Sequence, residues 1–137
     1  MLTIEQLRVE YPTAEGSYLA VDDISLSVEE GEFFTFLGPS GCGKTTTLRS
    51  TAGLETPTGG RITIGGDRVF DAEAGRVEPT HRRDISMVFQ SYAIWPNMTV
   101  AENVAFPLEV KRKSRAEVAA EVKRTLEMVG LGDYAER

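Results

Sequence analysis

The stretch that determines the fold reads Phe33-Phe34-Thr35-Phe36-Leu37-Gly38-Pro39-Ser40-Gly41-Cys42-Gly43-Lys44-Thr45. Residues 33–37 are almost continuously apolar, a pattern typical of a strand covered on both faces, as in a parallel sheet with helices packed on it. The glycine-rich part that follows matches G-x-x-x-x-G-K-[ST]. Residues 46–52 then predict a helix that Gly53 ends.

This motif predicts a site for the phosphates of a nucleotide. Its glycines let the backbone wrap closely round a polyphosphate and turn successive N–H groups inward, and the positive end of the helix dipole lies at the same place. Lys44 should reach the β- and γ-phosphates of ATP, and the hydroxyl of Thr45 should bind Mg²⁺. A glycine-rich turn with an ordinary surface lysine is the alternative, and the flanking strand and helix patterns argue against it. The predicted phosphate contacts are Gly38, Pro39, Ser40, Gly41, Cys42, Gly43, Lys44, Thr45 and Thr46.

Two segments with roughly alternating polarity precede the motif, at residues 2–9 and 19–28. Pro12 and Gly16 mark a turn between them, so we expect an antiparallel hairpin with one solvated face. The alternation in the second segment changes phase at Asp22-Asp23.

Further strands are expected after the motif. Residues 61–64 and 68–70 predict two short strands joined through Gly65-Gly66, followed by a polar loop over residues 71–83. Residues 85–89 form a second continuously apolar run and predict a buried strand that ends at Gln90.

Two helices are expected in the last third of the chain. Thr99 and Glu102 predict a capped helix that Pro107 interrupts. Ser114 and Glu117 have the same capping pattern. The second helix places four apolar residues on one face and ends at Gly130; they are Val118, Val122, Leu126 and Val129.

Composition limits the class of protein. The chain has 137 residues, of which 41% are hydrophobic and 26% charged, as in a soluble globular domain. The net charge of −6 argues against a nucleic-acid binder. Cys42 is the only cysteine, which excludes an internal disulfide and fits a reducing compartment. With no signal peptide pattern at the start, we expect a cytoplasmic protein.

The chain resembles the ABC ATPase family over nearly all of its length. The loop wording continues through Leu48-Arg49 and residues 52–55 into Pro57-Thr58-Gly59-Gly60, as ABC subunits usually read. Residues 85–90 resemble the strand and glutamine of the family's Q-loop, and residues 91–100 resemble the importer branch that serves polyamines, ferric iron or sugars. The resemblance implies an α/β fold, a P-loop NTPase of the ABC ATPase type with an antiparallel β subdomain.

Several roles follow from the resemblance. Tyr11 resembles the aromatic residue that stacks on adenine, although an ordinary strand-end aromatic is the alternative. Gln90 resembles the residue that touches Mg²⁺ or the attacking water, so Gln90 and Lys44 are the expected catalytic residues. Residues 92–98 are expected to form part of a groove for a membrane permease, with core packing of Ile94 and Trp95 as the alternative.

Three other features are expected to have no part in the chemistry. Cys42 lacks an evident paired base, as a catalytic cysteine would need. His81, the only histidine, is expected to be a solvated loop residue. Residues 111–113 form a small basic run that we expect to be a solvated connector, with contact to lipid headgroups as a minor alternative.

A working member of the family also needs a Leu-Ser-Gly-Gly-Gln signature, a strand ending in Asp-Glu and a later histidine, and the sequence contains none of these. Residues 1–137 are therefore expected to be an incomplete nucleotide-binding domain that ends before the signature, with its C-terminal part missing. We expect the isolated chain to be poorly stable and unable to turn over ATP.

The resemblance implies an energy-coupling subunit of an importer, at the inner face of the cell membrane. Such a subunit pairs with a second copy or another ABC subunit and contacts transmembrane permease subunits through residues 90–100. A truncated nucleotide-binding protein without hydrolysis is the first alternative, and a soluble ABC protein of translation or DNA repair is the second. Polyamine and ferric iron are the expected cargoes, with sugar third.

Overall fold

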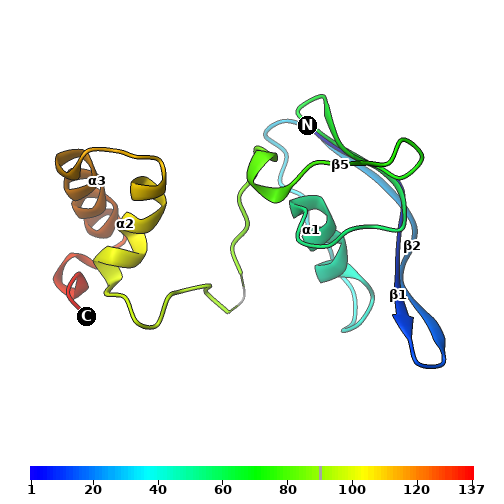
Figure 1. The fold of residues 1–137 in the computed structure, drawn as a ribbon, viewed down its shortest axis with the longest axis horizontal. Helices are drawn as coiled ribbons and strands as arrows, with labels where there is room; N and C mark the ends of the chain where they lie inside the picture. The colour runs from blue at the N-terminus through cyan, green and yellow to red at the C-terminus, as the bar shows by residue number, and fades with distance from the viewer. Residues whose placement is uncertain (90) are drawn as a thin grey trace. The chain divides into compact units, whose positions relative to one another are not determined.

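The protein divides into two compact units, Met1–Met87 and Val88–Arg137, which are coloured by residue number in Figure 1. The structure is a computed structural model that describes residues 1–89 and 91–137. Gln90, a predicted catalytic and magnesium-binding residue, lies outside the described residues.

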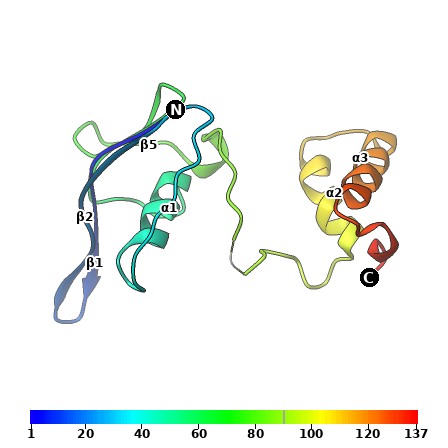
Figure 2. The same ribbon diagram turned by 180° about the vertical axis from the view of Figure 1, so that it is seen from behind.

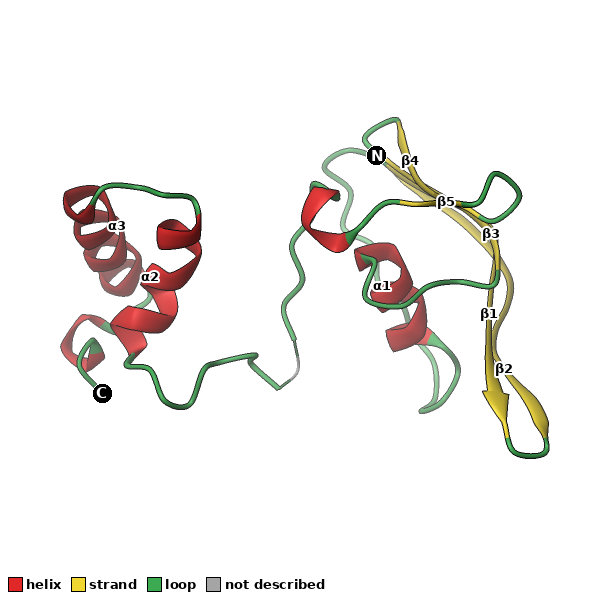
Figure 3. Ribbon diagram, viewed as in Figure 1, coloured by secondary structure: helices red, strands yellow, loops and turns green. Residues whose placement is uncertain are grey.

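The first unit is built on a sheet of five strands in the order β2-β1-β3-β4-β5 (Figure 3). All neighbouring strands run antiparallel, which confirms the predicted hairpin at the start of the chain and the predicted short pair after the glycine-rich loop. The strands are β1 (Leu2–Thr13), β2 (Gly16–Val28), β3 (Gly59–Ile64), β4 (Asp67–Asp71) and β5 (Arg76–Val77).

The predicted change of phase in the second strand is a β-bulge. Val9 pairs with Val21 and Leu7 pairs with Ile24, so β2 holds one residue more than β1 between these two pairs. Asp23 lies within this step and has a φ of 50°. A bulge of this kind increases the local twist of the hairpin and shifts which face each later side chain occupies.

One face of the sheet carries the buried core of the first unit. Helix α1 (Lys44–Ala52) lies beside the sheet in both Figure 1 and Figure 2. The helix ends as predicted at Gly53, which has a φ of 77° and donates its N–H to Ser50 O at 3.1 Å. The core cluster consists of Ile4, Leu7, Val9, Val21, Ile62, Val69 and Phe70.

The two continuously apolar segments are not strands, so their prediction is wrong. Within the described residues, 33–37 and 85–89 have no regular secondary structure and pair with no other segment. Phe33, Leu37 and Val88 expose 93%, 97% and 96% of their surface. An apolar run indicates a preference for burial, whereas a strand also needs a neighbouring strand for its backbone hydrogen bonds.

The second unit contains two helices, α2 (Val100–Val110) and α3 (Arg115–Met128), and a short 3-10 turn at Gly132–Tyr134. Both predicted capping boxes are present. Thr99 Oγ1 accepts the Glu102 N–H at 3.1 Å while Glu102 Oε2 accepts the Thr99 N–H at 2.7 Å, and Ser114 and Glu117 form the second box. Among the described residues, no helix has the length and apolar character needed to cross a membrane.

The predicted interruption at Pro107 is wrong, because α2 continues through it to Val110. Proline has no backbone N–H, so α2 lacks one hydrogen bond at this position. Its last turn forms nevertheless. The Lys111 N–H donates to Pro107 O at 3.3 Å.

The start of α2 is held by the end of the chain. Val100 N donates to Arg137 O at 2.9 Å, and Ala101 N donates to Ala135 O at 2.9 Å. The first N–H groups of a helix have no partner within the helix itself. The backbone after α3 therefore supplies acceptors that α2 lacks.

Candidate functional site

The glycine-rich loop delivers the chain into the start of α1. Gly41 and Gly43 have φ values of 83° and 88°, in the left-handed region that a side chain makes costly. Gly43 is the N-cap residue of α1, and no described side chain caps this helix start. The first N–H groups of α1 and the positive end of its dipole are therefore arranged for an anion.

The side chain of Lys44 adds a full positive charge to the loop. Its Nζ donates to Gly38 O at 2.7 Å and to Pro39 O at 2.6 Å, and lies 3.4 Å from Cys42 Sγ. These bonds hold the ammonium group inside the curve of the loop. A flexible lysine with three donors can exchange such carbonyl partners for the oxygens of an anion.

The loop packs directly against the hairpin. A side chain placed on Gly43 would come within 3.2 Å of Val21 Cγ2, so the loop backbone lies in contact with β2. The third glycine of the motif is thus needed both for its backbone conformation and for this close approach. The contact brings Ala20 and Val21 of β2 next to the start of α1.

A pocket of about 460 Å³ lies between the hairpin and the loop. It brings together seven of the predicted site residues, namely Tyr11, Ser40, Gly41, Gly43, Lys44, Thr45 and Thr46. Gly38, Pro39 and Cys42 are not on its walls, although Gly38 and Pro39 hold the Lys44 ammonium group. Tyr18 and Ala20 complete the lining.

Tyr18 and Ala20 were not among the site residues predicted from the sequence. The pairing of the hairpin strands indicates Tyr18, because this residue lies directly opposite Tyr11. The predicted strand began at residue 19, one residue too late to include it.

Tyr11 lies on the hairpin side of the pocket, and its phenol has a shifted pKa. Its phenol contacts the side chains of Thr46 and Glu55, which follow the loop in the sequence. Burial raises the pKa of Tyr11 above its ordinary value, and the hydrogen bond to Glu55 raises it further while the contact with Thr46 opposes both. The phenol therefore stays neutral.

Arg83 holds the other end of α1. Its side chain is buried, with 4% of its surface exposed, and it donates to Ser50 O at 2.8 Å, Thr51 O at 2.9 Å and Glu78 O at 2.9 Å. Burial lowers the pKa of this guanidinium, and the charge of Glu78 acts against that shift. A cation at the C-terminal end of a helix is favourable because the last carbonyl groups carry negative partial charge. No pattern in the polar loop indicated this role.

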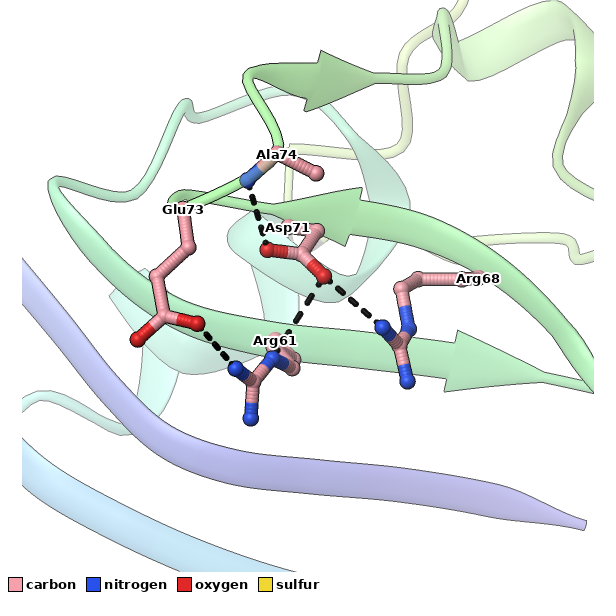
Figure 4. Close-up of polar contacts among 5 residues, drawn as sticks. All are labelled: Arg61, Arg68, Asp71, Glu73 and Ala74. Atoms are coloured by element: carbon pink, nitrogen blue, oxygen red, sulfur yellow. Dashed lines mark hydrogen bonds and ion pairs between the residues drawn. The ribbon is translucent and has the colours of Figure 1, made fainter.

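A second buried charge lies on the sheet, away from the pocket lining (Figure 4). Asp71 accepts the Ala74 N–H at 3.0 Å and a hydrogen bond from Arg68 Nη1 at 2.9 Å, and Arg61 Nε lies 3.4 Å from the same carboxylate. Arg61 also pairs with Glu73. The Ala74 N–H, with the two arginines, lowers the pKa of Asp71, whereas burial opposes that shift. This cluster fastens β3 to β4.

The predicted partner segment of the second unit is exposed. Tyr92, Ile94 and Trp95 all lie at the surface, and the ring of Trp95 packs against Phe106 of α2 at 5.8 Å between centroids. Asn103 fixes the segment to α2, since its side chain accepts the Trp95 N–H at 2.8 Å and donates to Thr99 O at 2.9 Å.

The remaining polar features are solvated, as expected. His81 lies exposed in the 3-10 turn Thr80–Arg82, and residues 111–113 are exposed between α2 and α3. Over residues 1–89 and 91–137, no three His, Cys, Asp or Glu side chains are gathered in a way that could hold a metal ion.

Comparison with known proteins gives consistent matches. The family model described as "ABC transporter" matches residues 21–137. The chain is 51% identical over 122 residues to the trehalose/maltose import ATP-binding protein MalK of Thermococcus litoralis, covering 89% of this chain and 33% of that protein. It is 47% identical over 134 residues to the spermidine/putrescine import ATP-binding protein PotA of Thermobifida fusca, covering 98% and 33%. The chain thus spans about a third of the length of these curated relatives.

A solved structure has the same fold. The ATP-binding cassette MJ0796, in a dimeric post-hydrolysis state bound to ADP and Pi, superimposes with a TM-score of 0.85 at 30% sequence identity. The match covers 100% of this chain and 61% of that chain. This likeness confirms the predicted fold class.

Proposed function

This chain belongs to the ABC transporter family, and we propose that it binds ATP with Mg²⁺ as part of a subunit that powers solute import. The family resemblance seen in the sequence is thereby confirmed. The observation that carries the proposal is a single pocket lined by Lys44, Thr45 and Tyr11, at a helix start that no described side chain caps.

The loop side of the pocket suits a polyphosphate. Backbone N–H groups at the start of α1 would donate to phosphate oxygens, and Lys44 would move from the carbonyls of Gly38 and Pro39 onto the β- and γ-phosphates. Thr45 lines the pocket beside Lys44, so its hydroxyl is placed to bind the metal ion that accompanies the nucleotide. Mg²⁺ would neutralise phosphate charge when bound.

The hairpin side of the pocket suits a base. Tyr11 lines the pocket from β1 and its phenol is neutral, so its aromatic ring is available to face a ligand. Stacking of a base on an aromatic ring contributes about 1–3 kcal/mol. We propose that Tyr11 stacks on adenine.

The test is Mg-ATP binding by the 137-residue chain and by Lys44→Ala, measured by isothermal titration calorimetry. Loss of a charge-assisted contact should weaken binding about 10- to 100-fold. Lys123→Ala is the matched control, because Lys123 is an exposed lysine of α3 that makes one ion pair, 3.9 Å from Glu127. Equal affinity in the wild type and Lys44→Ala would refute the proposed phosphate site.

We propose that this chain acts beside a second ABC subunit and a membrane permease, on the cytoplasmic side of the membrane. Residues 90–100 would make the permease contact, and Gln90 would contact Mg²⁺ or the attacking water. The exposed side chains of Tyr92 and Trp95 support the contact, and Asn103 holds the backbone of Trp95 to α2. Co-purification of the chain with a permease, reduced by Tyr92→Ser with Trp95→Ser, would test it. The imported solutes named for the relatives, spermidine/putrescine, Fe(3+) ions and trehalose/maltose, are the proposed cargo classes.

Binding without hydrolysis is the second candidate, favoured by the absence of a Leu-Ser-Gly-Gly-Gln signature from these 137 residues. We propose that the isolated chain binds Mg-ATP and releases no phosphate. A phosphate-release assay on the purified chain checks this. Release that Lys44→Ala abolishes would assign hydrolysis to these residues and contradict the binding-only proposal.

A further inference from the structure

The pocket has two tyrosines on its hairpin side. Tyr11 comes from β1 and Tyr18 from β2, and both line the same cavity as Lys44 and Thr45. Only Tyr11 has a role in the function proposed above. Tyr18 exposes 53% of its surface, so its ring is accessible to a ligand.

The strand register places the two tyrosines side by side. Tyr11 and Tyr18 are direct partners across the antiparallel pair, and directly opposed residues project from the same face with Cβ atoms about 5 Å apart. Both side chains therefore line the same wall of the pocket. The turn at residues 14–15 lies between them, a few residues from each.

We propose that Tyr18 is a second base-binding residue, which extends the aromatic surface of Tyr11 so that a two-ring base rests on both tyrosines. The ligand class is then a purine nucleoside triphosphate, held at one end by the glycine-rich loop and at the other by the tyrosine pair. A pyrimidine has one ring and reaches only the Tyr11 part of this surface. The inference rests on the proposed nucleotide function.

Hairpin stability needs to be separated from base contact, because an opposed aromatic pair also stabilises the two strands. Tyr18→Leu keeps an apolar side chain in the pair and removes the aromatic face, whereas Tyr18→Trp keeps both. Three probes divide the two effects: Mg-ATP, Mg-UTP and magnesium tripolyphosphate. A loosened hairpin weakens all three alike, while a lost base contact weakens ATP most and leaves tripolyphosphate unchanged.

The experiment measures dissociation constants of the full 137-residue chain for the three probes. Tyr18→Leu should weaken ATP binding about 5- to 10-fold, with a smaller change for UTP and none for tripolyphosphate. Tyr18→Trp should bind ATP with about the affinity of the wild type, because it keeps an aromatic side chain at this position. The matched control is Tyr134→Leu, because Tyr134 is a partly exposed tyrosine of the other compact unit and should leave all three constants unchanged.

A spectroscopic readout follows from the single tryptophan of the chain, Trp95. In a Trp95→Phe background, Tyr18→Trp introduces the only indole, and ATP should quench its fluorescence while tripolyphosphate should not. If the wild type binds ATP and Tyr18→Leu changes all three constants by one factor or by none, the inference is overturned. If the wild type binds neither ATP nor tripolyphosphate, the proposed function fails and the inference fails with it.

Discussion

Gly43 lies so close to Ala20 that a Cβ on Gly43 would fall 2.6 Å from the Ala20 carbonyl oxygen. Gly43 is the N-cap of α1, and Ala20 belongs to β2. This contact joins the hairpin to the glycine-rich loop through backbone atoms. The tyrosine wall and the Lys44 wall of the pocket are therefore held at a set distance.

Gly43→Ala should destabilise the first unit and weaken nucleotide binding. The substituted residue would have to keep a φ of 88° and would also collide with Ala20 O, so we expect a loss of more than about 2 kcal/mol in the free energy of unfolding. Gly41→Ala is the matched control, because Gly41 has a φ of 83° with no atom within 4 Å of an added Cβ.

Urea unfolding followed by circular dichroism measures both variants. Gly41→Ala carries only the conformational cost of about 1–2 kcal/mol. Similar losses for the two variants would mean that the approach to Ala20 adds nothing.

Arg83→Met should destabilise the first unit by about 2–4 kcal/mol, because three carbonyl oxygens lose a buried donor. Arg83→Lys should recover only part of this loss, since an ammonium group cannot reproduce the planar arrangement of guanidinium donors. Thermal unfolding of the wild type, Arg83→Met and Arg83→Lys compares the three stabilities.

The control for Arg83 is its neighbour. Arg82 has 70% of its side chain exposed and forms one ion pair, 3.7 Å from Glu78. Arg82→Met should change the unfolding free energy by less than about 0.5 kcal/mol. Equal effects at the two positions would contradict the assignment of Arg83 as the cap of α1.

Asp71 should make stability depend on pH in the acidic range. Its pKa lies below the ordinary value of 3.8, so the folded state favours the charged carboxylate. Its contribution is fully present above the unfolded-state pKa, at about pH 4, and is lost as pH falls through the lower folded-state pKa. Asp71→Asn should therefore lower stability at neutral pH.

The measurement is urea unfolding of wild type and Asp71→Asn from neutral to acidic pH. Their difference in unfolding free energy should be constant above about pH 5 and should shrink below about pH 4. Asp67→Asn, at an exposed position of β4, is the control and should resemble the wild type at neutral pH. A difference that grows as the solution is acidified would show the wrong sign and reject this account.

Pro107→Ala should stabilise the second unit. Pro107 is exposed within α2, so alanine restores a backbone donor without disturbing a core, and we expect a gain of about 1–3 kcal/mol. The helical circular dichroism signal, followed as the temperature rises, measures this change in stability. Glu109→Ala, an exposed position of the same helix, should change stability by less than about 0.5 kcal/mol. A lower midpoint for Pro107→Ala would mean that the proline ring makes stabilising contacts.

Local signals in the sequence predicted local structure well. The capping boxes at Thr99 and Ser114 and the glycine that ends α1 depend on residues a few positions apart, so their patterns are visible without a fold. The bulge at Asp23 could be predicted for the same reason.

Features that depend on distant neighbours were missed or wrong. The apolar segment at residues 33–37 predicts a strand, but pairing depends on a partner that no pattern within the segment specifies. Pro107 was expected to interrupt a helix that in fact starts at a capping box and continues to Val110. Arg83 and Tyr18 act through residues far from them or across a strand pair, which the motif could not indicate. The loop motif predicted the Lys44 side of the pocket and the family resemblance indicated Tyr11, whereas Tyr18 became visible only in the folded hairpin.

The hydrogen bonds from Val100 and Ala101 to Arg137 and Ala135 have a consequence for the order of events during synthesis. A ribosome makes the chain from its N-terminus, so α2 emerges well before the residues that accept its first N–H groups. Its capping box can form at once from Thr99 and Glu102, but its first turn is complete only after residue 137 has been made. The start of α2 would then be completed only after α3 and the residues that follow it have been made.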